Sequence, residues 1–398
     1  MKKRDWNIKD NDINFFIKLD QERRELIQKL EALKAEKNKI SKSKPTKEQL
    51  VELRALNQKI EKEEQILKAK EKGFNAFLGK LPNLPQPEVP LGKDESENKV
   101  IKTVGQPTKF DFPAKDYLEL SRIHDLLDTE RAAKVSGSRF GYIKREAALL
   151  WSALVQYAWS VILKEGFTPF YSPVLVKKEV MENSGYDAYV EGQEAYFLEK
   201  DQLYLIGTGE HALLPYHANE ILQEKELPLC YSTYSTCFRR EAGSYGKDTK
   251  GIFRVHQFDK LEMVVITAPE KSKAEFERLV KIQEKIVQGL GLPYQLLEVC
   301  TGDLPKPSAK VVDLECWLPS ENRYRETHSA SNCTDYQARR NNIRFKDGQG
   351  KTNFVHILNA TGVTPRLLIM ILENYQTKQG FIEVPKVLRK YLDFKVIK

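Results

Sequence analysis

Residues 237–263 read CFRREAGSYGKDTKGIFRVHQFDKLEM, and this stretch decides the fold of the larger part of the chain. The overlapping runs YSTYSTCFRREAG and GIFRVHQFDKLEMVVIT are rich in aromatic and β-branched residues, which favour strands. The segment between them carries glycine and charge, which is typical of a loop. We therefore expect two antiparallel strands joined in a long hairpin.

The segments around this hairpin mix helix and strand patterns. RFGYIKREAALLWSALVQYAWSVILKEG predicts a strand that leads into a long helix. The apolar face of that helix consists of Leu150, Leu154, Tyr157 and Val161. In GFTPFYSPVLV, Pro169 and Pro173 restrict a strand to a sheet edge or bulge. NATGVTPRLLIMILENYQ predicts a strand end, a tight turn at Gly362 and Pro365, and a helix. Such irregular mixing favours the α+β class.

The N-terminal part predicts an antiparallel helical hairpin, a coiled-coil arm. Two seams repeat every seven residues: Leu19, Leu26, Leu33 and Ile40, then Leu53, Ile60, Leu67 and Phe74. SKSKP at 41–45 separates them, and Thr46 with Gln49 forms the pattern of a capping box. At ~1.5 Å per residue, helices of about 23 and 30 residues make an arm of roughly 35 to 45 Å.

The charge of the arm admits two interpretations. Residues 18–72 hold 16 Lys or Arg against 11 Asp or Glu, an excess of five positive charges. Without further context an ordinary solvated coiled coil used for oligomerisation is favoured over an RNA-binding arm.

LPNLPQPEVPLG at 81–92 is a stiff proline-rich connector. We therefore expect two domains, 1–105 and 106–398.

Composition restricts the class of protein further. The chain carries 64 Lys or Arg and 56 Asp or Glu, a net charge of +8 that suits phosphate partners without proving them. Its five cysteines are scattered without metal-site spacing, so we expect reduced thiols, no zinc and a cytoplasmic location. No secretory leader and no membrane span is expected from the N-terminus or from LLIMIL at 367–372.

Strand parity identifies a candidate binding site. Side chains two apart on a strand share a face, so Arg239 pairs with Glu241, and likewise Thr208 with Glu210 in LIGTGEH. Phe258 and Glu262, four apart, share a face on the return strand for the same reason. A cation, an aromatic plate and several carboxylates suit a zwitterionic substrate and an aromatic, phosphorylated one. Ordinary cross-strand ion pairing on an exposed sheet would produce the same arrangement of side chains. Strand parity by itself favours this interpretation over a binding site.

Other candidates are less specific. DLECWLPSENRYRETHSASN supplies oxygen ligands that suit Mg²⁺ shared with substrate phosphates: Asp313, Glu315, Glu326 and Ser329. Arg366 lies in the first turn of a predicted helix, where a positive charge is unfavourable beside the helix dipole unless an anion binds there. An exposed arginine that points into solvent is an equally favoured interpretation. His256 on a half-buried strand is more simply structural than catalytic. Neither GxxxxGK[ST] nor GxGxxG occurs.

CFRREAGSYGKDTKGIFRVHQFDKLEM resembles the second signature motif of the seryl-tRNA synthetases, a class II aminoacyl-tRNA synthetase family, and NATGVTPRLLIMILENYQ resembles the third. GFTPFYSP resembles the first, dimer-forming motif, and the resemblance spans essentially the whole chain. It implies a class II catalytic domain built on an antiparallel sheet flanked by helices. It also implies serine contacts at Thr208, Glu210, Arg239, Glu262, Asn359 and Thr361, and ATP contacts at Arg239, Glu241, Phe258, Glu326, Ser329 and Arg366.

The same resemblance implies catalytic roles for Arg239 and Glu241, and Mg²⁺ ligated by Glu326 and Ser329. The reaction would join L-serine and ATP into seryl-adenylate and pyrophosphate, then transfer serine to the 3′ end of tRNA(Ser), with tRNA(Sec) as a further acceptor. A homodimer is implied, and the arm would hold the long variable arm of the tRNA, which reverses the preference for oligomerisation. The loop Ala242 to Gly251, with Lys247 and Lys250, would be a mobile tongue over ATP.

Three differences from the family pattern stand out. Gly207 and Gly209 replace a usual proline and alanine, which frees the backbone near Thr208. Pro305-Lys306-Pro307 replaces a glycine-phenylalanine stretch, and four residues separate Thr361 from Arg366 instead of five. Two alternatives remain: a ligase that loads amino acids onto a carrier protein, whose relatives lack the arm, and a non-catalytic RNA-binding paralogue, which would lose an ATP ligand.

Overall fold

The computed structural model describes residues 10–42, 45–186, 194–242 and 250–398. The chain divides into two compact units, Met1–Pro82 and Asn83–Lys398. The proline-rich connector after residue 82 therefore belongs to the second unit, as does the strand at residues 99–104.

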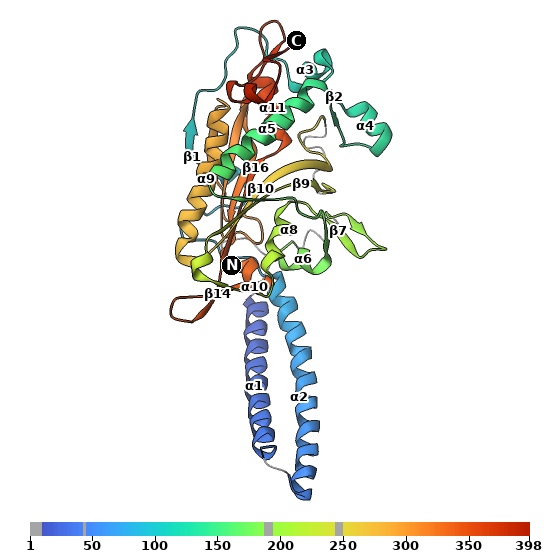
Figure 1. Ribbon diagram of the computed structural model, residues 1–398, viewed down its shortest axis with the longest axis vertical. Coiled ribbons are helices and arrows are strands. Elements are labelled where there is room, and N and C mark those ends of the chain that lie inside the picture. The colour runs from blue at the N-terminus through green and yellow to red at the C-terminus, as the bar shows by residue number, and fades with distance from the viewer. Residues whose placement is uncertain (1–9, 43–44, 187–193, 243–249) are drawn as a thin grey trace. The chain divides into compact units, whose positions relative to one another are not determined.

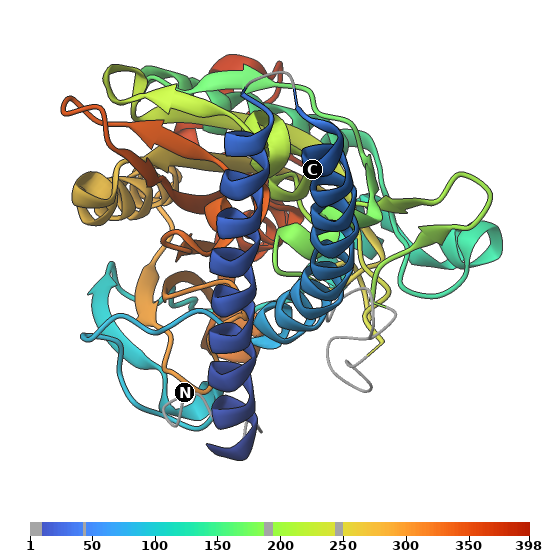
Figure 2. The same ribbon diagram turned by 90° about the horizontal axis from the view of Figure 1, so that it is seen from below.

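The first unit is a hairpin of two antiparallel helices, α1 (Asp10–Ile40) and α2 (Lys47–Lys80), which lie side by side in Figures 1 and 2. Leu30, Leu33, Leu56 and Ile60 form its buried seam, and Leu67 packs against it. With 31 and 34 residues, both helices are longer than expected. The predicted capping box is confirmed: Thr46 Oγ1 accepts from Gln49 N–H at 3.3 Å, and Gln49 Oε1 accepts from Thr46 N–H at 2.9 Å.

Ion pairs and aromatic stacking add to this seam. Lys29 meets Glu63 at 2.6 Å and Lys34 meets Glu64 at 2.7 Å, across the two helices. The ring of Phe16 stacks on Phe74 and Phe77 with centroids 4.8 and 4.7 Å apart. Because Lys29, Lys34 and Glu64 are exposed, with Glu63 alone of the four buried, the apolar seam contributes most of the pairing free energy.

The second unit is built on an eight-stranded sheet, and the α+β expectation is confirmed. Its strand order is β1 (Lys99–Val104), β11 (Tyr294–Glu298), β12 (Lys310–Leu318), β13 (Arg323–Asn332), β16 (His356–Val363), β10 (Gln257–Thr267), β9 (Leu229–Phe238) and β4 (Thr168–Phe170). All neighbours are antiparallel except β4, which lies parallel to β9 at the edge. The edge position of β4 accommodates Pro169, as expected.

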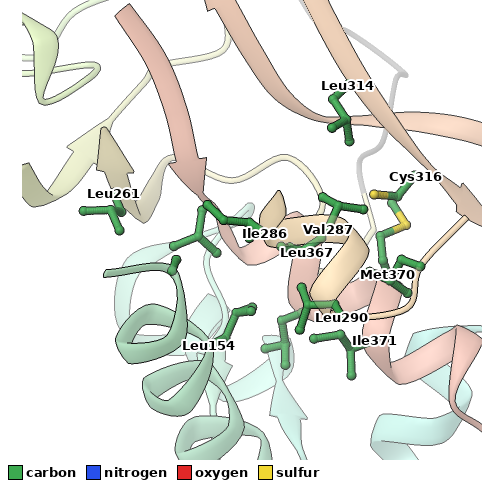
Figure 3. Close-up of a cluster of buried hydrophobic side chains, with 14 of the residues drawn as sticks. Leu154, Leu261, Ile286, Val287, Leu290, Leu314, Cys316, Leu367, Met370 and Ile371 are labelled. Carbon is green, nitrogen blue, oxygen red and sulfur yellow. The ribbon is translucent and has the colours of Figure 1, made fainter. Parts of the chain in front are cut away.

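Helices cover one face of this sheet. The long helices are α5 (Arg145–Lys164), α9 (Ser272–Gly289) and α11 (Pro365–Asn374), and all three contact sheet strands (Figure 1). Figure 3 shows their apolar side chains meeting those of β10 and β12, with Leu154, Leu261, Ile286, Leu314 and Met370 among them. At ~25 cal/mol per Å² of apolar surface, this core is the main stabilising contribution to the fold.

Shorter elements complete the unit. The helices are α3 (Tyr117–His124), α4 (Thr129–Ser136), α6 (Lys178–Asn183), α8 (Glu210–Leu213) and α10 (Tyr336–Asn341). Two small sheets have two strands each: β2 (Leu127–Asp128) with β3 (Tyr142–Ile143), and β17 (Ile382–Glu383) with β18 (Val396–Ile397). In one three-stranded sheet, β7 (Leu203–Leu205) lies between β5 (Leu175–Lys177) and β6 (Phe197–Leu198). In the other, β14 (Arg344–Lys346) lies between β8 (Ile221–Gln223) and β15 (Thr352–Phe354). The strand expected before α5 is only the two-residue β3.

Two expectations about the third motif meet different outcomes. Helix α11 begins at Pro365 with Arg366 in its first turn, as predicted. The tight turn expected at Gly362 is wrong, because Gly362 lies inside β16. There the pairing with β10 shifts from Leu261↔Val363 to Glu262↔Thr361. A Cβ at Gly362 would lie 2.8 Å from Ile162 Cδ1, so close packing requires glycine.

In the described part of the chain, the helix Arg145–Lys164 alone is long and apolar enough to cross a membrane. Its buried face, which includes Leu150, Leu154 and Ile162, packs into the core, so it is a core helix of the second unit.

Glu373 joins three elements in the interior, and its loss is expected to destabilise the unit. Its fully buried carboxylate accepts hydrogen bonds from Tyr117 N at 2.9 Å and from Ser320 N and Oγ, both at 3.0 Å. Glu373→Ala leaves these donors unpaired and should lower the free energy of unfolding by about 2 to 4 kcal/mol. Urea titration followed by circular dichroism measures this. The control E383A, at an exposed site, should change little, and equal losses would contradict the assignment.

Candidate active site

A cavity of about 370 Å³ opens where β9, β10, β13 and β16 meet the start of α11. All eleven residues implied by the family resemblance line it: Thr208, Glu210, Arg239, Glu241, Phe258, Glu262, Glu326, Ser329, Asn359, Thr361 and Arg366. They belong to the second unit, in which Figure 1 labels β9, β10, β16, α8 and α11. Residues far apart in the sequence thus share one cavity.

The hairpin of β9 and β10 provides the wall of the cavity. Its predicted antiparallel pairing is confirmed, with Phe258 opposite Cys237 and Glu262 opposite Thr233. The guanidinium of Arg239 lies 5.2 Å from the centroid of the Phe258 ring, and its Nε donates to Gly207 O at 3.1 Å. These contacts hold the Arg239 side chain in one orientation toward the cavity.

The deep end of the cavity holds two carboxylates, Glu210 and Glu262, each 2 % exposed. Lys260 Nζ lies 2.5 Å from Glu262 Oε2 and is itself buried. Glu210 instead accepts from Gln337 Nε2 at 2.7 Å and from Tyr186 Oη at 3.1 Å. Burial, followed by the nearby Glu262, raises the pKa of Glu210 to about 7. This end therefore offers oxygen acceptors to an ammonium and a hydroxyl.

Small polar groups surround these carboxylates. Thr208, Asn359 and Thr361 are 4 %, 8 % and 7 % exposed and line the same cavity. The Thr208 hydroxyl accepts from Glu210 N–H at 3.3 Å. Thr361 is the cross-strand partner of Glu262 because of the register shift at Gly362. The pairing brings a hydroxyl next to a carboxylate.

Glu241 is held in an unusual backbone conformation. Its φ of 53° is left-handed, which is uncommon for glutamate and is often seen at functional sites. Its carboxylate pairs with Arg254 at 2.7 Å, and its carbonyl accepts from Arg139 Nη1 at 3.3 Å. Arg139 belongs to the VSGSRF stretch, so this stretch helps to position the loop side of the hairpin.

At the other end, Arg366 meets an anion, which answers the question raised by its place at a helix start. Its Nη1 lies 2.9 Å from Glu326 Oε2, and its guanidinium carbon lies 4.8 Å from the centroid of the Phe253 ring. Desolvation opposes the ionisation of Glu326, whose side chain is still 47 % exposed, but the charge and hydrogen bond of Arg366 lower its pKa. Glu326 is therefore a carboxylate at neutral pH.

Glu326 and Ser329 face the same cavity because β13 is irregular. The register with β12 changes from Asp313↔Ser329 to Glu315↔Glu326, leaving Thr327 as an extra residue, as in a β-bulge. Asp313 and Glu315 lie instead in an adjoining cavity of about 800 Å³, which shares Glu326 and Ser329. Burial, with Glu326 nearby, raises the pKa of Asp313 well above its usual value. All four oxygen ligands thus line the adjoining cavity, and of these four Glu326 and Ser329 also line the first cavity.

Several cavity residues escaped the sequence interpretation, among them Tyr186, His211, Lys260 and Arg254. Parity could have identified Lys260, because it lies between Phe258 and Glu262 on the same face of β10. No local pattern points to Gln337, which reaches Glu210 from α10. His256 does not line the cavity; its Nδ1 contacts Arg239 O at 2.9 Å, in agreement with a structural role.

The glycines near Thr208 act through packing and hydrogen bonding. Gly209 has φ −59°, which any residue adopts, so the expected backbone freedom is not used there. A Cβ at Gly209 would lie 2.5 Å from Thr233 Cγ2. Gly207 N–H donates to His211 Nδ1 at 3.3 Å. Pro305 of the unusual proline stretch also lines the cavity. Of the expected tongue, residues 243–249 with Lys247 lie outside the described residues.

Comparison with known proteins supplies a family. Residues 1–85 match the model of the seryl-tRNA synthetase N-terminal domain, and residues 196–375 match the class II tRNA synthetase core domain for G, H, P, S and T. A serine--tRNA ligase of Dictyoglomus turgidum is 42% identical over 394 residues, covering 97% of this chain and 93% of its own. One from Sulfurihydrogenibium is 48% identical over 324 residues, or 81% and 78% of the two chains.

Solved structures agree with these sequences. The crystal structure of seryl-tRNA synthetase from Pyrococcus horikoshii complexed with ATP matches with a TM-score of 0.89 at 40% identity, covering 97% of this chain and 93% of that one. The cytoplasmic enzyme of Naegleria fowleri in complex with AMP matches with a TM-score of 0.86 at 34% identity, covering 97% and 91%. Both N-terminal and catalytic units therefore have counterparts in one known architecture.

Proposed function

The chain belongs to the seryl-tRNA synthetase family and is an ATP-dependent serine--tRNA ligase, and we propose that the cavity between β9, β10, β13 and β16 is where it activates serine. The observation that carries this proposal is the convergence of eleven sequence-selected side chains on that single cavity. The family activity joins serine to ATP and then transfers the seryl group to the 3′ end of tRNA(Ser).

Serine occupies the deep end in this proposal. Glu210 and Thr208 take the ammonium group, while Glu262 and Thr361 take the hydroxyl, with Asn359 supporting the pocket. The low exposure of these five side chains supports the assignment. Alanine lacks the hydroxyl of serine and would leave a buried acceptor without a hydrogen bond, which lowers its binding free energy relative to serine. Arg239 then faces the serine carboxylate.

ATP occupies the outer end. The Phe258 ring, against which Arg239 lies, offers a face for the adenine, and Glu241 holds the nucleotide from the loop side. Arg366, at the start of α11, provides a cation for the phosphates, and the helix N-terminus adds a favourable dipole. Glu326 and Ser329 complete the set of proposed ATP contacts.

The chemistry then needs positioning and charge neutralisation. A serine carboxylate oxygen attacks the α-phosphorus, and the bond to the bridging oxygen of pyrophosphate breaks. Arg239 contacts both reacting groups and stabilises the negative charge that builds up on the α-phosphate. In the second step the terminal ribose hydroxyl of the tRNA attacks the seryl carbonyl, and AMP leaves. Neither step requires a covalent bond to the enzyme.

Mg²⁺ fits this site as a partner of ATP. Glu326 is ionised beside Arg366, and Ser329 adds a hydroxyl oxygen, both of which are suitable donors for magnesium. Within the described ranges, no group of three or more His, Cys, Asp and Glu side chains is placed to hold a metal ion. The protein therefore supplies part of a coordination shell that phosphate oxygens complete, and the ion would neutralise phosphate charge.

In this proposal the first unit, Met1–Pro82, is the tRNA-binding domain and the second unit, Asn83–Lys398, is the catalytic domain, so the boundary expected at residue 105 moves to residue 82. The helical hairpin carries an excess of five positive charges in residues 18–72 and holds the long variable arm of tRNA(Ser) through its backbone. Selenocysteine tRNA, with a comparable arm, is proposed as a second acceptor. We place the enzyme in the cytoplasm, consistent with its scattered cysteines.

A homodimer is proposed across the first motif, and aromatic exposure supports it. Next to the edge strand β4, Tyr171 is 85 % exposed and Tyr216 56 % exposed, and Phe170 contacts the Tyr216 ring edge-on at 5.3 Å. Exposed aromatic clusters are typical of interfaces. Light scattering should give twice the mass of one chain, and Tyr171→Asp should shift the protein toward monomer. The exposed-tyrosine control Tyr142→Asp should remain dimeric, whereas a monomeric wild type would refute the proposal.

Pyrophosphate exchange tests the activity directly. Labelled pyrophosphate should enter ATP in the presence of serine, with at most weak exchange for threonine, alanine or glycine. A protein that shows no exchange with any amino acid would overturn the proposal in favour of an RNA-binding paralogue. A ligase acting on a carrier protein would exchange serine but would not charge tRNA(Ser).

A further inference from the structure

The two buried carboxylates of the cavity have different kinds of partner. Glu262 lies against a cation, with Lys260 Nζ 2.5 Å from its Oε2. Glu210 is held by two neutral donors, Gln337 Nε2 on Oε1 at 2.7 Å and Tyr186 Oη on Oε2 at 3.1 Å. Within the part of the chain that the structure describes, no cationic nitrogen lies within 4 Å of Glu210.

We propose that Gln337 and Tyr186 are positioning residues that hold Glu210 ready for the substrate ammonium, and that serine binds the ionised form of Glu210. This inference rests on the proposed placement of serine in the deep end of the cavity. Lys260 has the complementary role: it occupies one oxygen of Glu262, so that the other oxygen faces the cavity for the hydroxyl.

The ionisable side chains around Glu210 support these different roles of Glu210 and Glu262. They come from four elements: Tyr186 after α6, His211 on α8, Arg239 after β9, and Lys260 and Glu262 on β10. Burial lowers the pKa of His211 to about 3, and its Nδ1 already accepts from Gly207 N–H, so His211 is neutral. The two cations Arg239 and Lys260 then balance the two anions Glu210 and Glu262. With Glu210 ionised, these four groups have no net charge, which suits serine as a zwitterion without net charge.

The sign of the pH dependence follows from this balance. Burial and Glu262 raise the pKa of Glu210 to about 7, so below that pH the free enzyme carries a protonated Glu210. A protonated carboxyl cannot pair with an ammonium, and the serine affinity should fall as the pH falls below 7, approaching tenfold per pH unit. ATP affinity should not follow this profile.

Gln337 tunes the transition because its hydrogen bond favours the ionised form. Gln337→Met keeps the volume but removes the donor, and it should move the midpoint of the serine profile upward by about one pH unit. The serine KM at pH 7 should rise by about fivefold, because the ionised fraction of Glu210 falls from about one half to about one eleventh, with the ATP KM unchanged. Tyr186→Phe removes the other donor and should shift the midpoint in the same direction. It also serves as the test if Gln337→Met fails to fold.

The experiment measures serine-dependent pyrophosphate exchange by the full-length protein from pH 6 to 8.5. Calorimetric titration with serine in two buffers of different ionisation heat gives the proton release directly. The control Gln376→Met removes a buried glutamine that does not line the cavity and whose Nε2 donates to Lys115 O and Glu373 O, and it should leave the midpoint unchanged.

Two results would overturn the inference: buffer-independent binding heats at pH 6.5, or a midpoint that neither Gln337→Met nor Tyr186→Phe moves. A wild-type protein without serine exchange would instead refute the proposed site and function. An upward shift in both variants, with proton release in the wild type, is the expected result.

Discussion

Arg239→Gln is expected to lower the rate of serine-dependent pyrophosphate exchange by about 10²- to 10³-fold, because one preorganised cation is lost from the charge that develops at the α-phosphate. The side chain is anchored by Gly207 O at 3.1 Å and by the Phe258 ring, so its orientation is set before substrates bind. Arg239→Lys should recover little, since an ammonium cannot present two parallel donors to a carboxylate and a phosphate.

Arg240 offers a matched control for this experiment. It is the next residue in the chain, but its guanidinium lies over the Tyr196 ring at 5.5 Å and it does not line the cavity. Arg240→Gln should therefore keep exchange within about threefold of the wild type, which is near 0.6 kcal/mol. If Arg239→Gln behaves like Arg240→Gln under saturating ATP and serine, Arg239 does not act on the reacting groups.

Deletion of residues 18–72 is expected to abolish tRNA charging while adenylate formation stays within about twofold of the full chain. The hairpin has its own seam of Leu30, Leu33, Leu56 and Ile60, and it forms a separate compact unit, so the catalytic core should fold without it. Loss of several phosphate contacts costs orders of magnitude in tRNA affinity at physiological salt. Aminoacylation and pyrophosphate exchange, measured on the same preparation, separate the two effects.

A charge-preserving variant serves as the control for the deletion. In the wild type, Lys29 Nζ lies 2.6 Å from Glu63 Oε1. The swap K29E/E63K retains an ion pair between the two helices with the charges exchanged, and it leaves the net charge of the arm unchanged. It should fold and charge tRNA nearly as well as the wild type. If the deletion removes exchange and charging together, the hairpin supports the catalytic unit structurally and the division of labour is wrong.

Sequence patterns were sufficient wherever a local rule applied. The seven-residue seam and the Thr46 capping box predicted the hairpin, although the helices extend further. Helix α1 begins at Asp10, before the seam, and there the Phe16 ring stacks on Phe74 and Phe77 of α2. Alternation predicted β9 and β10, and it correctly put Phe258 and Glu262 on one face. The same rule could also have identified Lys260.

Local rules failed where the chain departs from regular pairing. Glu326 and Ser329 are three apart and would face opposite ways on a regular strand, but the register shift at Thr327 brings both to the cavity. Glycine commonly marks a turn, but Gly362 lies within a strand, where close packing against Ile162 and Leu261 favours a residue without a side chain. Such shifts depend on the partner strand, which no local pattern specifies.

From sequence alone, then, the α+β class and the helical hairpin could be predicted, since periodicity is a property of a single segment, and the motifs shared with the seryl-tRNA synthetases supplied the eleven candidate residues, whose roles stay predictions. The tertiary structure alone decided which charges meet. Gln337 and Tyr186 reach Glu210 from elements far apart in the chain, and Lys260 pairs with Glu262 rather than with a neighbour across the sheet. The ionisation of a buried group is set by every dipole and charge around it, and only the packed fold brings those together.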